Sequence, residues 1–159
     1  MNLFLLLLLL NNIVGCSNEN LLTIETNAMV IKDNNLKNYL KKKSNRSKSY
    51  AAIYFTSSNC PSCKKVNKTL PEKVTRIKEK YNIDFYLCLY CETVEQEQKY
   101  LKNFSSFIHV DNEKKKMLKG ELQVSRVPTM FLIDLNNFVI ISKNILPNIL
   151  KGTISKFLV

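Results

Sequence analysis

The sequence predicts an α/β fold in which a central mixed β-sheet is flanked by helices. Short apolar runs rich in β-branched and aromatic residues alternate with segments whose apolar residues recur one helical turn apart. Near the C-terminus, two further β-like runs are joined at Asn136-Asn137, which is typical of a hairpin. The chain of 159 residues is long enough for one well-formed core and too short to divide comfortably into two domains.

The first 33 residues are expected to precede this domain. Residues 1–15 contain the apolar run Leu5 to Leu10, which suits the hydrophobic part of a secretory signal and is too short to span a bilayer. Ile13-Val14-Gly15-Cys16 resembles the lipobox of bacterial lipoproteins, which implies cleavage before Cys16 and a lipid on its sulfur. An ordinary leader or an uncleaved anchor with a free Cys16 is the alternative. Residues 16–33 would then form a tether and a first strand.

In the domain over residues 34–159, the spacing of apolar residues and the polar residues between segments indicate where helices and strands begin and end. A helix begins near Asn35, where Asp33 or Asn34 can cap its N-terminus. A short, β-favouring apolar run bounded by polar residues indicates a buried strand at 50–56. The complete expectation is a strand or short hairpin within 21–31, the helix from 35, the strand 50–56, a helix 61–80 bent at Pro71, a strand 83–91, a helix 95–104, an extended piece 107–110, a helix 112–118, paired strands 128–133 and 138–142, and a helix 145–158.

A Cys-x-x-Cys motif, Cys60-Pro61-Ser62-Cys63, lies where the strand 50–56 ends and a helix begins. A thiol at a helix N-terminus faces unpaired backbone N–H groups, which stabilise the thiolate. Pro61 suits the first helical turn, and a second thiol one turn further on can close a small disulfide. The alternatives are an inert disulfide or half of a metal site, but a metal would need further Cys or His ligands at a suitable spacing. The pattern favours a redox-active dithiol and no metal.

The order strand, Cys-x-x-Cys, long helix, strand and helix resembles the thioredoxin superfamily when it is read with the segment 124–134. That segment has the pattern V-x-x-x-P-T-x-x-x-I-D, which the family shows around its cis-proline. The segment 95–137 is most similar to the membrane-tethered extracytoplasmic thioredoxin-like proteins typified by TlpA and ResA. The resemblance covers roughly residues 34–158.

The resemblance implies a mechanism that uses no cofactor. Cys60 would attack a partner's disulfide, and Cys63 would then resolve the mixed disulfide. Val127 and Pro128, joined by a cis peptide bond, would lie beside the pair and bind an extended substrate through the backbone of Val127.

Two positions depart from the family's pattern. Tyr54 stands in the strand where relatives carry a buried acid that relays protons to the second cysteine. We expect Tyr54 to support the site mainly by packing in the core, with its hydroxyl available for a hydrogen bond. Asn59 stands where the family usually has an aromatic residue. The direction of electron flow is therefore open.

A second Cys-x-x-Cys pair, Cys88 and Cys91, lies in the expected strand 83–91. Positions three apart on a strand point to opposite faces, so these thiols cannot easily form a disulfide. Cys88 is expected in the core. Cys91 is a candidate third redox thiol, because its strand should end beside the one that leads to Cys60; an ordinary strand-end residue is the alternative. His109 is expected to be a strand residue, with copper ligation as its alternative.

The net charge of +11 is spread over the chain and does not alternate with aromatic residues as nucleic-acid-binding motifs do. A basic surface on an exported protein favours an anionic membrane. We therefore expect an extracytoplasmic, lipid-anchored thiol–disulfide oxidoreductase that is a monomer and binds no nucleic acid. Its partners would be cysteine pairs of exported proteins and a membrane redox donor or acceptor. The alternative is a non-catalytic module of the same fold, either a Sco-like copper chaperone or a protein-binding adaptor.

Overall fold

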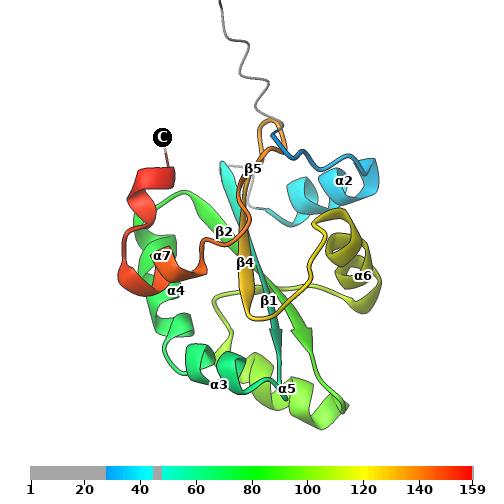
Figure 1. Ribbon diagram of the computed structural model, residues 1–159, viewed down its shortest axis with the longest axis vertical. Coiled ribbons are helices and arrows are strands. Elements are labelled where there is room, and N and C mark those ends of the chain that lie inside the picture. Colours follow the sequence, from blue (N-terminus) through cyan, green and yellow to red (C-terminus); the bar gives the residue numbers. More distant parts are fainter. Residues whose placement is uncertain (1–27, 45–47, 159) are drawn as a thin grey trace, which may run out of the picture.

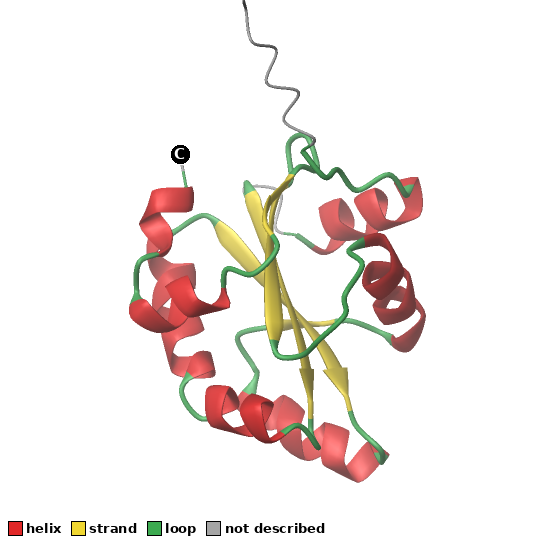
Figure 2. Ribbon diagram, viewed as in Figure 1, coloured by secondary structure: helices red, strands yellow, loops and turns green. Residues whose placement is uncertain are grey.

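The computed structural model describes residues 28–44 and 48–158. Within these residues, the strands form one mixed sheet in the order β3-β2-β1-β4-β5, with helices on both faces (Figures 1 and 2). β1 runs parallel to β2, and β2 parallel to β3, whereas β4 is antiparallel to both β1 and β5. The α/β class with a mixed sheet is confirmed. The strand bounds are β1 (Tyr50–Ser57), β2 (Ile83–Tyr90), β3 (Ile108–His109), β4 (Thr129–Asp134) and β5 (Ile140–Ser142).

β1 is the central strand, and its side chains enter two different cores. Ala52 and Tyr54 belong to the core cluster on one face of the sheet, while Ala51, Ile53 and Phe55 belong to the cluster on the other. All five side chains are fully buried. A strand covered on both faces reads as a continuous apolar run, which is why the sequence pattern identified it.

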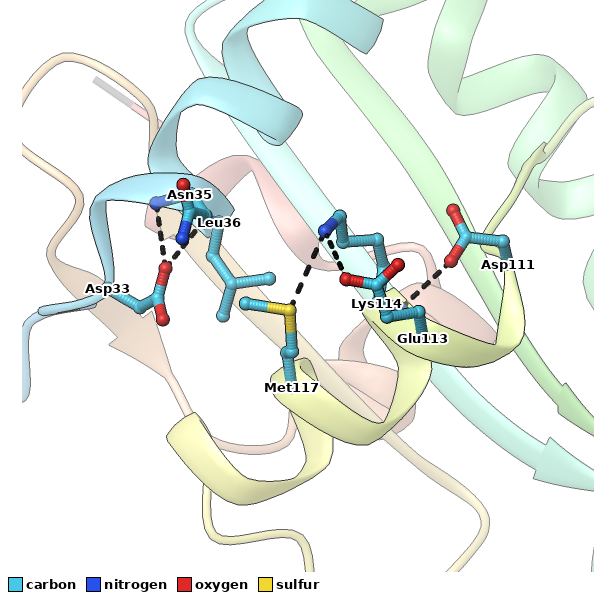
Figure 3. Close-up of polar contacts among 7 residues, drawn as sticks. All are labelled: Asp33, Asn35, Leu36, Asp111, Glu113, Lys114 and Met117. Atoms are coloured by element: carbon cyan, nitrogen blue, oxygen red, sulfur yellow. Dashed lines mark hydrogen bonds and ion pairs between the residues drawn. The ribbon is translucent and has the colours of Figure 1, made fainter.

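Two pairs of helices enclose the sheet. α4 (Leu70–Lys80) and α7 (Leu146–Lys151) pack on one face, and α2 (Asn34–Lys43) and α6 (Asn112–Glu121) on the other (Figure 1). Figure 3 shows how α2 and α6 begin: Asp33 accepts from the backbone N–H of Asn35 at 2.7 Å, and Asp111 from that of Lys114 at 2.9 Å. Each carboxylate satisfies N–H groups that have no partner within the helix.

Two expected helices are each divided in the structure. The segment expected to form one helix over 61–80 forms two, α3 (Pro61–Asn67) and α4. The helix is interrupted at residues 68–69 instead of bending at Pro71. Pro71 lies in the first turn of α4, where its missing N–H costs no helical bond. The helix expected over 145–158 stops at Gly152, which has a left-handed φ of 72°, and resumes as the 3₁₀ helix η1 (Ile154–Phe157).

The leader (1–15), Cys16 and most of the expected tether lie outside the described residues. The described end of the tether contacts the domain: Val30 forms a single antiparallel bridge with Val139, and Ile31 is fully buried. Among the helices of the described part, none is both long and apolar enough to cross a bilayer.

Candidate functional site

Cys60 lies at the junction between β1 and α3. Its backbone N–H donates to the carbonyl of Ser57, the last residue of β1, and its side chain caps the N-terminus of α3. The Sγ atom accepts a hydrogen bond from the backbone N–H of Cys63 at 3.2 Å. Pro61 occupies the first turn of α3, as expected. The strand–turn–helix order thus directs unpaired helical N–H groups at one thiol.

The two thiols of the motif differ in burial and in proton affinity. Burial raises the pKa of the Cys60 thiol, but hydrogen bonds from the Cys63 side chain and from the backbone of Cys63 and Ser62 outweigh it and hold this pKa below its ordinary value. Cys63 is fully buried, and this burial, together with its hydrogen bond to Cys60, raises its pKa. Cys60 is therefore the thiol suited to act as the accessible nucleophile, and Cys63 is the thiol that keeps its proton to higher pH.

Val127 and Pro128 lie directly beside Cys60. Their peptide bond is cis, as the resemblance implies. The thiol of Cys60 donates to the carbonyl oxygen of Val127 across 3.8 Å. The antiparallel pairing of β4 with β1 causes this contact, because Thr129 is opposite Phe55 and so carries the preceding residues to the end of β1.

Behind Cys63 is a small, partly buried polar network in which Tyr54 takes part. The Tyr54 hydroxyl donates to Oδ1 of Asn67 at 2.7 Å, and Nδ2 of Asn67 donates to Oγ1 of Thr56 at 3.2 Å. The Thr56 hydroxyl in turn forms a hydrogen bond to the Cys63 side chain that lowers the pKa of this thiol, against the larger effect of burial. Neutral hydroxyl and amide groups thus stand where relatives were expected to carry an acid.

Sequence reasoning missed Thr56 and Asn67. Thr56 is two residues after Tyr54, so both side chains share one face of β1. Asn67 is four residues after Cys63, so both lie on one face of α3. These two spacings were available in the sequence and could have identified both residues.

Cys88 and Cys91 point to opposite sides of the sheet, as expected. Cys88 is fully buried in one core cluster, whereas Cys91 is half-buried against the other and follows the end of β2. Burial raises the pKa of the Tyr100 hydroxyl, and electrostatic interaction with Cys91 and Cys63 raises it further. All four described cysteines are free thiols in this structure.

His109 is not brought to the Cys60–Cys63 pair. Its Nε2 lies 3.2 Å from the carboxylate of Glu97 on α5 (Val94–Asn103). Across residues 28–44 and 48–158, no three His, Cys, Asp or Glu side chains gather in a way that could hold a metal ion.

The comparisons with known proteins begin with solved structures that share the fold. Tryparedoxin II from C. fasciculata is 19% identical, with a TM-score of 0.61 over 76% of this chain and 91% of the other. Thioredoxin from Wuchereria bancrofti is 20% identical, with a TM-score of 0.58 over 74% of this chain and 85% of the other. Tryparedoxin I from Leishmania major is 15% identical, with a TM-score of 0.62 over 69% and 78%.

At these identities the solved structures show a common fold. No curated protein sequence matches the chain. A family model described as thioredoxin-like matches residues 47–139, which is more than half of the sequence and includes both the Cys-x-x-Cys motif and the cis-proline. The chain therefore belongs to the thioredoxin-like family.

Proposed function

We propose that this protein is a thiol–disulfide oxidoreductase that exchanges disulfides with cysteine pairs of exported proteins. One observation carries the proposal: Cys60 Sγ accepts the helical N–H of Cys63 at 3.2 Å while its neighbouring thiol is fully buried. This arrangement makes Cys60 a thiolate at a pH where Cys63 still holds its proton.

The reaction follows from these two states. The Cys60 thiolate attacks one sulfur of a substrate disulfide, forms a mixed disulfide and releases the other substrate sulfur as a thiolate, which takes up a proton. Cys63 then loses its proton and attacks Cys60 Sγ. The Cys60–Cys63 disulfide forms, and the second substrate sulfur leaves. Two electrons have passed to the substrate, and the reverse sequence oxidises a substrate dithiol.

Val127 is the substrate-binding residue in this proposal. Its carbonyl oxygen is already within 3.8 Å of Cys60 Sγ, so an extended segment of substrate that pairs with the Val127 backbone would hold its disulfide beside the nucleophile. Pro128, which directly precedes β4, positions this backbone. Tyr54 acts at a distance, through Asn67 and Thr56.

Turnover of a protein disulfide tests the assignment. With dithiothreitol as the reductant, the purified protein should accelerate the reduction of insulin. The Cys60→Ser variant should lose this acceleration, and the Cys63→Ser variant should accumulate a mixed disulfide through Cys60. Cys16→Ser, which removes a cysteine that is not part of the proposed redox site, should keep turnover of insulin by the purified protein. Unchanged turnover by Cys60→Ser would refute the assignment.

We further propose that the protein is of the membrane-tethered, extracytoplasmic kind typified by TlpA and ResA. The support is the leader pattern in residues 1–15 and the lipobox-like segment that ends at Cys16. A lipid on Cys16 would hold a monomer at the outer side of a membrane. There a membrane redox donor or acceptor would exchange electrons with Cys60 and Cys63.

A further inference from the structure

Two hollows lie next to Cys60: the chain neighbour Asn59 lines one, and Val127, whose carbonyl oxygen contacts Cys60 Sγ, lines the other. The first, the α3–α5 groove, has a volume of about 520 Å³; its lining includes Ser58, Asn59, Lys64, Lys68, Lys99 and Tyr100. The second, the Val127 hollow, has a volume of about 300 Å³; its lining includes Tyr90, Lys119, Arg126 and Val127. A polypeptide whose disulfide reaches Cys60 must cover part of this surface.

Spacing explains why the α3–α5 groove is basic. Lys64 follows Cys60 by four residues and Lys68 follows it by eight. Cys60, Lys64 and Lys68 therefore lie on one side of α3, counting its two cap residues. Lys99 and Tyr100 stand on the opposing side, on α5. The three lysines are exposed, and none has an ion pair among the described residues.

The groove is also pre-formed. Tyr100 Oη donates to the carbonyl of Ser58 at 3.3 Å, and the Ser58 hydroxyl donates to the side chain of Gln96 at 3.2 Å. Ser58 is buried. These hydrogen bonds hold α5 against the turn that precedes Cys60, so the backbone positions that carry the lysines are fixed before a substrate binds.

Acidic side chains are absent from the lining of both hollows in the described part of the chain. The one carboxylate of α5 with described ion-pair partners, Glu97, is directed to His109 and Lys115. In the Val127 hollow, Lys119 lies over the ring of Tyr90, and Arg126 directly precedes Val127. Every charged side chain that lines these hollows is therefore a cation.

We infer that the redox site selects disulfides embedded in acidic segments of partner proteins, through Lys64, Lys68 and Lys99 in the α3–α5 groove and Lys119 and Arg126 in the Val127 hollow. This inference rests on the proposed function. Unpaired cations beside the nucleophile attract acidic polypeptides during encounter, repel basic ones, and add close ion pairs in the mixed-disulfide complex.

Three matched peptide substrates test the inference. They have the same length and the same internal disulfide, and are flanked by Glu, Ser or Lys residues. At low ionic strength, kcat/KM for the Glu peptide should exceed that for the Lys peptide by about tenfold or more, and added salt should reduce this ratio towards one. A ratio of one at low salt would overturn the inference.

Charge reversal then locates the selectivity. Lys68→Glu/Lys99→Glu should abolish or invert the ratio between the Glu and Lys peptides. Lys65→Glu/Lys102→Glu is the matched control, since both lysines are exposed, lie three residues from the test positions, and do not line the groove. Equal effects of the two double variants would assign the preference to net charge and overturn the groove's role. Lys64 is left unchanged because it is one turn from Cys60.

Hydroxyethyl disulfide, a small neutral substrate, separates the two proposals. If the wild-type protein reduces hydroxyethyl disulfide, and reduces the three peptides at the same rate as one another, the thiol chemistry is present and only the acidic preference fails. If the wild-type protein reduces none of these disulfides, the proposed function fails, and the inference fails with it.

Discussion

Cys60 and Cys63 are three residues apart, yet their surroundings move their pKa values in opposite directions. Hydrogen bonds from backbone N–H groups and from the Cys63 side chain stabilise the Cys60 thiolate, whereas burial penalises the Cys63 thiolate. This separation assigns the order of attack, because the thiol with the lowered pKa ionises at a lower pH than its neighbour does.

The pH dependence of alkylation should follow this separation. Below the pKa of an ordinary thiol, Cys60 should react with iodoacetamide faster than a free cysteine, because its lowered pKa leaves more thiolate. The Cys63→Ala variant loses the S–H donor but keeps the backbone N–H, so the midpoint for Cys60 should move to higher pH. Mass spectrometry of the alkylated peptide measures this midpoint. If the midpoint for Cys60 in the wild-type protein lies at or above that of free cysteine, the assignment of Cys60 as the nucleophile is contradicted.

The Thr56 hydroxyl should assist the second step. Thr56→Val removes a hydrogen bond that lowers the pKa of Cys63, so the pKa should rise further and resolution should slow by roughly tenfold at neutral pH. Ellman's reagent reports both steps, since attack by Cys60 and then by Cys63 each releases one coloured thiolate. The second release should shift to higher pH in Thr56→Val but not in Thr56→Ser. An unchanged profile in Thr56→Val would exclude this role.

At the level of elements, the two described glycines should respond to alanine in opposite ways. Gly152 ends α7 with a φ of 72°, whereas Gly120 lies within α6. An added Cβ meets no atom within 4 Å at either position, so the backbone alone decides. Gly152→Ala should destabilise the fold by about 1–2 kcal/mol because Cβ disfavours the left-handed region.

Gly120→Ala should stabilise the fold, by up to about 1 kcal/mol, because alanine loses less backbone entropy in a helix. Urea denaturation of both variants beside the wild type measures the two changes in the free energy of unfolding. Changes of the same sign would show that the backbone account is wrong for at least one helix.

At the scale of the whole molecule, the net charge of +11 and the lipobox-like segment both favour a membrane surface. The native protein should partition into the detergent phase through lipid on Cys16, and Cys16→Ala should remain in the aqueous phase. Cys91→Ala, which removes a different cysteine, is the control and should partition like the wild type. Detergent partitioning by Cys16→Ala would argue against lipidation.

Features that depend only on neighbouring residues could be predicted before any tertiary contact was known. The apolar run before Cys60 and the helical spacing after Cys63 placed the dithiol at a strand–helix junction, and the β-like runs gave the correct class of sheet. Both are local patterns, and a local pattern can be read without knowing what packs against it. The division at residues 68–69 was missed because Pro71 is compatible with either a bend or a new first turn.

The residues that surround Cys60 and Cys63 are brought there by the tertiary structure. Val127 reaches Cys60 across 67 residues of sequence because β4 pairs antiparallel with β1. Tyr54, Thr56 and Asn67 join behind Cys63 only when α3 packs on that face of the sheet. The lysines of α3 and α5 face one groove for a similar reason. These contacts depend on strand order and helix packing, which are non-local, and no periodicity within one segment specifies them.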